Sequence, residues 1–186
     1  MSLSDQEKWD AIHANSPEYD NVSPVVMARE HFFPRTGKAL DVAGGSGRHA
    51  LWLAQRGMEV TLVDISTVAL QRARHDAADI DVSLNTCRLD LQIQEIPAGP
   101  WDLILTVLFY QPSLFSQCIN ELADGGRLIV IQPTDDNLLR HKKPPKRFLT
   151  NPAELLELVK PLRVVHFEAD WLEAGRHDAF LVAEKY

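Results

Sequence analysis

The chain has 186 residues, 45% of them hydrophobic and 24% charged, with a net charge of −7. This length predicts one domain with a substantial core, and the acidic balance argues against a nucleic-acid partner. No apolar run is long enough for a membrane span, and the N-terminus has no apolar signal core, so no membrane span is expected. The isolated Cys87 and Cys118 suit neither a disulfide framework nor a zinc site. A reducing, cytoplasmic location is therefore expected.

The predicted elements begin with two helices, at residues 4–14 and from the Ser23-Pro24 cap toward Phe32. Helices and strands then alternate. The strands are expected at 38–42, 58–63, 81–86, 101–108 and 127–132, and the helices at 48–56, 66–78 and 112–123. Gly57 is the expected C-terminal cap of the first of these helices, and Ser66 is the expected N-terminal cap of the second. This alternation predicts an α/β fold with a doubly wound, mostly parallel sheet.

The last part of the chain breaks the alternation. A helix at 151–158 is followed by strands at 163–171 and 178–184, with only the turn Glu173-Ala-Gly175 near their junction. Because a parallel crossover needs a dozen or more residues, these two strands must be antiparallel. The sheet is therefore predicted to end in a C-terminal hairpin.

The most informative segment is Ala39–Arg48, which reads as a buried strand, a glycine turn and the start of a helix. The next predicted strand ends at Asp64. A glycine turn lets the backbone approach a ligand closely, and an acid after the second strand can accept hydrogen bonds from ribose hydroxyls. The two features together predict a nucleoside site, although a tight turn without a ligand, or an Asp64 that only caps the next helix, would use the same residues.

The sequence of this turn is compatible with two kinds of cofactor. Gly45–Ala50 fits the dinucleotide fingerprint, which would suit a short NAD(P)-linked oxidoreductase, but no tyrosine is followed by a lysine four positions later. Asp41 also stands at the end of the first strand, where its carboxylate would repel a pyrophosphate and favour an ammonium group. The turn therefore favours S-adenosylmethionine.

Several segments resemble the successive motifs of class I S-adenosylmethionine-dependent methyltransferases. They are Leu40–Gly47, Val63–Ser66, Leu89–Leu91, Trp101–Leu105 and Leu122–Val130. The likeness covers roughly residues 38–132, and Glu7–Asp10 and Gly175–Ala183 are similar to the small bacterial tellurite-resistance-type branch. The resemblance implies a Rossmann-like, seven-stranded sheet with an antiparallel strand seven.

The expected organisation is a single methyltransferase domain over residues 1–186. Its parts are N-terminal helices or a lid (1–35), a cofactor-binding core (38–132), a basic loop (133–150) and a C-terminal helix and hairpin (151–186). The basic loop holds five Lys and Arg residues within Arg140–Arg147, which could hold an anionic substrate or simply be a solvated loop. The number of subunits is not predicted.

The resemblance places the cofactor at the end of the first strands. The residues expected to line its site are Asp41, Ala43, Gly44, Gly45, Gly47, Asp64, Ile65, Asp90, Leu91 and Thr106. Ala43 departs from the family, which usually has glycine there. Because alanine resists positive φ angles, cofactor affinity is in doubt if the turn needs such an angle at this position.

Acceptor contacts are expected after the strand 101–108. Tyr110 and Gln111 are candidates there, and Trp9 and Tyr19 are candidates in the N-terminal lid, although all could be packing residues. His13, His49 and Tyr110 are weak candidates for a catalytic base, and no metal site is expected. The predicted function is methyl transfer to a small-molecule acceptor, with a non-catalytic S-adenosylmethionine-binding module as the alternative.

Overall fold

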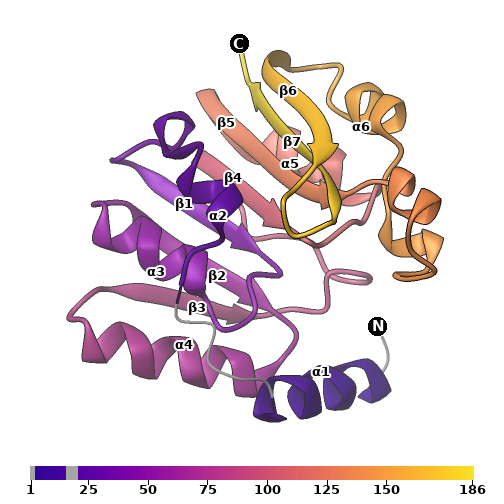
Figure 1. Cartoon of the computed structure of the whole chain (residues 1–186). Coiled ribbons are helices and arrows are strands. Elements are labelled where there is room, and N and C mark those ends of the chain that lie inside the picture. The colour runs from indigo at the N-terminus through magenta and orange to yellow at the C-terminus, as the bar shows by residue number, and fades with distance from the viewer. Residues whose placement is uncertain (1–2, 16–20) are drawn as a thin grey trace.

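A computed structural model describes residues 3–15 and 21–186. Within these residues, seven strands form one sheet in the order β3-β2-β1-β4-β5-β7-β6 (Figure 1). They are β1 (Lys38–Val42), β2 (Glu59–Asp64), β3 (Leu84–Arg88), β4 (Trp101–Val107), β5 (Leu122–Pro133), β6 (Arg163–Trp171) and β7 (His177–Glu184). Among these strands, β7 alone runs opposite in direction to the others. The predicted α/β sheet with a C-terminal antiparallel hairpin is therefore confirmed.

Helices cover both faces of this sheet. They are α1 (Leu3–Asn15), α2 (Pro24–Met27), α3 (Arg48–Gln55), α4 (Thr67–Asp79), α5 (Leu114–Glu121) and α6 (Pro152–Leu158), with short 3-10 turns η1 (Glu30–Phe32), η2 (Asp135–Leu139) and η3 (Lys146–Phe148). One face packs on α3 and α4, and the other packs on α5 and α6. In the described part of the chain, no helix combines the length and apolar content needed to cross a bilayer.

The central strand β4 explains the most apolar run of the sequence. Leu103 and Leu105 face one core and Ile104 faces the other, and none of these side chains is exposed. Successive side chains of a strand point to opposite faces, so a strand covered on both sides must be apolar throughout.

One predicted helix and the start of one predicted strand differ from those observed. The helix expected from Ser23 to Phe32 divides into α2 and η1, because Arg29 leaves helical geometry at φ −123° and ψ 23°. The strand expected at 81–86 begins only at Leu84, because Asp81 takes a left-handed φ of 54° just after α4. Both differences come from single residues whose backbone angles the hydrophobic pattern does not reveal.

The fifth strand is longer than predicted. β5 begins at Leu122 instead of Arg127, because Leu122 pairs with Trp101 before an irregularity shifts the register to Leu103 and Arg127. The Gly125-Gly126 segment lies inside this extended strand. Glycine and aspartate are rare in strands, so the sequence pattern leaves this segment between the predicted helix 112–123 and the predicted strand 127–132.

The helix caps follow the sequence closely. The hydroxyls of Ser23 and Ser66 accept hydrogen bonds from the amides of Val26 and Ala69, at 3.4 and 3.1 Å. Gly57, after α3, has a φ of 103°. These positions confirm the predicted cap residues.

Candidate cofactor and acceptor site

The glycine turn joins β1 to α3 at the carboxyl ends of the parallel strands, called here the carboxyl edge. Ala43, Gly45 and Gly47 all have left-handed backbones, with φ of 55°, 60° and 82°. The amide of Gly44 donates to the carbonyl of Val63 at 3.2 Å, which ties the turn to β2. The turn therefore does require a positive φ at Ala43, where a side chain costs about 1–2 kcal/mol.

Asp41 is buried directly beneath this turn, with no exposed surface. Neither carboxylate oxygen has a hydrogen-bond partner among the described residues, although the nearby backbone amide of Ala50 and the charge of Arg48 favour the ionised form. A Cβ atom added at Gly44 would lie 2.5 Å from Oδ2 of Asp41, so only glycine fits above the carboxylate. Burial, reinforced by the nearby charge of Asp64, raises the pKa of Asp41 to about 7.

Asp64 ends β2 and is almost fully buried. Its Oδ2 accepts the amide of Gly45 and its Oδ1 accepts the amide of Ser66, both at 2.8 Å. Asp64 therefore fixes the glycine turn relative to the start of α4. The cap of α4 itself is the hydroxyl of Ser66, so Asp64 is not the helix cap.

Helix α1 packs along the start of α4 (Figure 1). The Oδ1 of Asp10 accepts hydrogen bonds from the Ser66 hydroxyl at 2.6 Å and the Val68 amide at 3.1 Å. His13 lies over the turn, because a Cβ atom at Gly45 would be 3.0 Å from its ring. Sequence reasoning named His13 but missed Asp10, since its partners lie more than fifty residues away along the chain.

The structure places the remaining candidates for cofactor contact in different environments. Ile65 and Asp90 are partly exposed, and Asp90 accepts the amide of Gln92 at 3.1 Å. Leu91, only 4% exposed, packs in the core. Trp9 lies near His13, with ring centroids 6.2 Å apart, whereas Tyr19 lies outside the described residues.

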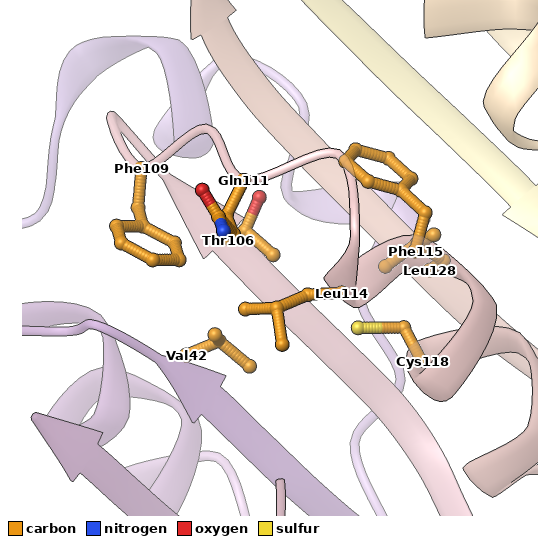
Figure 2. A pocket seen from close by; sticks show the side chains of 8 residues that line it. All are labelled: Val42, Thr106, Phe109, Gln111, Leu114, Phe115, Cys118 and Leu128. Atoms are coloured by element: carbon orange, nitrogen blue, oxygen red, sulfur yellow. The ribbon is translucent and has the colours of Figure 1, made fainter. Parts of the chain in front are cut away.

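The end of β4 leaves the sheet through a strained residue. Leu108 has a φ of 60° and is 44% exposed. Beside it lies a small cavity of about 10 Å³, close to the space of one water molecule (Figure 2). Its lining residues are Val42, Thr106, Phe109, Gln111, Leu114, Phe115, Cys118 and Leu128. Thr106 and Gln111 therefore share one hollow at the carboxyl edge.

The candidate bases His49 and Tyr110 are poorly suited to proton abstraction. His49 is buried against Ser23, whose amide donates to Nε2 at 3.5 Å, and burial together with Arg48 lowers its pKa to about 3. Tyr110 packs edge-on against Phe115, and burial raises its pKa above the ordinary value. Neither side chain therefore has a pKa near neutrality, where a general base works best.

Comparison with known proteins agrees with this geometry. Residues 39–126 match the family model of the methyltransferase domain. The chain is 32% identical over 92 residues to protein-L-isoaspartate O-methyltransferase of Stenotrophomonas maltophilia strain K279a, which covers 50% of this chain but only 40% of that relative.

Solved structures share the fold across nearly the whole chain. TehB from Haemophilus influenzae superposes with a TM-score of 0.74 at 21% identity, over 96% of this chain and 67% of that one. A methyltransferase from Aquifex aeolicus superposes with a TM-score of 0.67 at 17% identity, over the full length of both. At these identities the likeness shows the fold alone. The family match shows a methyltransferase domain over residues 39–126, and the structural likeness shows that the chain has the fold of S-adenosylmethionine-dependent methyltransferases.

Proposed function

We propose that this protein transfers a methyl group from S-adenosylmethionine to a small-molecule acceptor. The observation that carries the proposal is the buried carboxylate of Asp41 beneath the glycine turn, which has no hydrogen-bond partner among the described residues. A buried charge without a partner is costly. A cationic ligand at this turn, such as the ammonium or sulfonium group of the cofactor, would favour the ionised carboxylate.

The surrounding residues fit the rest of that cofactor. Each oxygen of Asp64 already accepts one amide, and a carboxylate oxygen can accept a further hydrogen bond, so ribose hydroxyls could bind there. Ile65 and Asp90 would lie toward the adenine. His13 and α1 would cover the turn and exclude water from it.

When bound, the cofactor supplies a methyl group already activated on a positive sulfur. The chain's contribution is then to hold the acceptor in line and to keep water away, which requires no metal and no catalytic triad. Thr106, Phe109 and Gln111 stand at the end of β4 and would contact the acceptor. Because Tyr110 stays protonated at neutral pH, it can donate a hydrogen bond but would not remove a proton.

Among the described residues, no extra domain is inserted between the strands of the sheet to grip a macromolecule, which favours a small acceptor. The isoaspartate methyltransferase relatives act on proteins by name, but the chain spans only 40% of their length. The second candidate function is a non-catalytic S-adenosylmethionine-binding module, which the strained Ala43 favours because strain in the turn could weaken the productive geometry.

The test is thermal unfolding with S-adenosylhomocysteine and, in parallel, with NAD(H). Ligand at about 100 times its dissociation constant adds roughly 2.7 kcal/mol, a shift on the order of 5–10 °C for a chain of this length. A shift with S-adenosylhomocysteine alone supports the cofactor, and a shift with NAD(H) alone contradicts it. Transfer of labelled methyl to a panel of acceptors then separates the enzyme from the binding module.

A further inference from the structure

The basic loop leaves the carboxyl edge after β5 and projects beside the β6–β7 hairpin (Figure 1). Its base is firmly held. The amide of Asp135 donates to Thr150 and the amide of Thr150 donates to Pro133, both at 3.0 Å, and the side-chain amide of Gln132 donates to the carbonyl of Phe148 at 2.7 Å. Between these anchors, residues 138–148 are exposed except for a half-buried Pro144. The loop is thus a protrusion on a fixed base.

The charge of this protrusion is opposite in sign to that of the rest of the molecule. It carries the cations Arg140, Lys142, Lys143, Lys146 and Arg147, and removing these five charges from the net −7 leaves −12. The two acids of the loop are engaged at its base, where Asp135 accepts from Asn151 at 3.1 Å and Asp136 lies 3.6 Å from His177. The loop therefore presents positive charge on an acidic protein.

The same protrusion exposes large apolar side chains. Leu139 is 78% exposed, Leu138 43% and Phe148 42%. Single exposed apolar residues are ordinary, but these three stand among five cations on one projecting loop. Apolar and cationic side chains together are the composition of segments that bind at the surface of anionic membranes.

A small anion fits this loop less well. The guanidinium of Arg140 is stacked on Trp171, 3.7 Å from the ring centroid, and that of Arg147 lies over Phe148 at 4.7 Å. The three lysines are exposed, and the cavity beside β4 is lined by other residues. A small-molecule site would need cations converging on a hollow, whereas an extended surface needs only the arrangement seen.

We propose that the basic loop docks this protein on the surface of an anionic phospholipid bilayer. The lysines would contact the headgroups, and Leu139 and Phe148 would enter the boundary between headgroups and acyl chains. The sequence predicts no membrane-spanning segment, but docking on a membrane surface does not require one. Docking by this loop would turn the carboxyl edge, with its acceptor side, toward the lipid.

The experiment is co-sedimentation of the full chain with phosphatidylcholine vesicles, with and without phosphatidylserine. We expect binding only to the anionic vesicles, with release as salt is raised. Each cation removed should weaken binding about fivefold, so the double variant Lys142→Gln/Lys143→Gln should lose about 25-fold. Leu139→Ala should lose about tenfold, because it removes apolar surface from the lipid boundary.

Matched controls lie elsewhere on the surface. Ile93 is as exposed as Leu139, at 78%, and Lys160 is an exposed lysine on another element, so Ile93→Ala and Lys160→Gln should leave binding unchanged. Equal binding to neutral vesicles, no binding at low salt, or equal losses in the controls would overturn the proposal. Binding to poly-glutamate without binding to vesicles would also overturn it and indicate an acidic protein partner. None of these readouts depends on methyl transfer.

Discussion

The two halves of the carboxyl edge differ in whether their charged side chains are buried or exposed. On the side of β1 and β2, Asp41 and Asp64 are buried beneath or beside the glycine turn, and α1 lies against it. On the side of β4 and β5, the loop carries its charges into solvent. Buried groups constrain their neighbours strongly, whereas exposed loops tolerate change. The difference agrees with the extent of the family match, which covers residues 39–126 and ends before the basic loop.

The largest expected effect comes from exchanging a glycine on each side. Gly44→Ala places a methyl 2.5 Å from both Asp41 and Leu62, so we expect a loss of about 3 kcal/mol in the free energy of unfolding and no stabilisation by S-adenosylhomocysteine. Gly175 lies in the hairpin turn with a φ of 79°, and a Cβ atom added there by Gly175→Ala would meet nothing within 4 Å. It should cost only about 1 kcal/mol and keep the ligand effect. Urea unfolding measures both, and equal losses would contradict the comparison.

The buried titratable groups on the cofactor side should oppose each other in their effect on pH dependence. The pKa of Asp41 is raised to about 7, so its contribution to stability falls as pH rises from about 4 to 7. The pKa of His49 is lowered to about 3, so its contribution grows between about pH 3 and 6.5. Between pH 4 and 6.5 the two trends should largely cancel.

Single variants should therefore expose each trend. Asp41→Asn should make stability rise with pH by about 1.4 kcal/mol per unit between pH 4 and 6.5, and His49→Gln should make it fall by a similar amount. Urea unfolding at pH 4.5, 5.5 and 6.5 measures the slopes. If either variant kept the slope of the unmodified chain, the corresponding group would not be buried as described.

A smaller effect is expected where α1 docks. Asp10→Ala removes the acceptor of the Ser66 hydroxyl and the Val68 amide, which should cost about 1 kcal/mol and speed the dissociation of S-adenosylhomocysteine. Glu7→Ala, at an exposed position of the same helix, is the control. Stopped-flow displacement reports the dissociation rate, and unchanged rates in both variants would show that α1 does not retain the cofactor.

The smallest effect should come from relieving strain in the turn. Ala43→Gly removes a side chain from a φ of 55° and should stabilise the protein by about 0.5–1 kcal/mol. Asp81→Gly relieves a similar φ of 54° far from the turn. Both should raise the urea midpoint, but only Ala43→Gly should alter affinity for S-adenosylhomocysteine. An identical affinity in both variants would mean that the strain at Ala43 has no bearing on binding.

The sequence predicted those features that local pattern controls. The strands 38–42 and 163–171, the caps at Ser23 and Ser66 and the terminal hairpin were predicted where they occur, because burial, caps and short connections leave local signals. The contacts of Asp10 with α4 could not be predicted, since they join segments far apart in the chain. The conformation of Ala43 stayed open because alanine gives no sign of a left-handed backbone.

The position of α1 affects the order in which the two products can leave the site. This helix packs on α4 at the cofactor side, whereas the end of β4 remains partly exposed at Leu108. Under the proposed function, the used cofactor could leave only after α1 separates from Ser66 and Val68, but a methylated product could leave past the loop without that step. Product release should then follow a fixed order, in which the methylated product leaves first. Separation of α1, which releases the used cofactor, should be the slower step of each turnover.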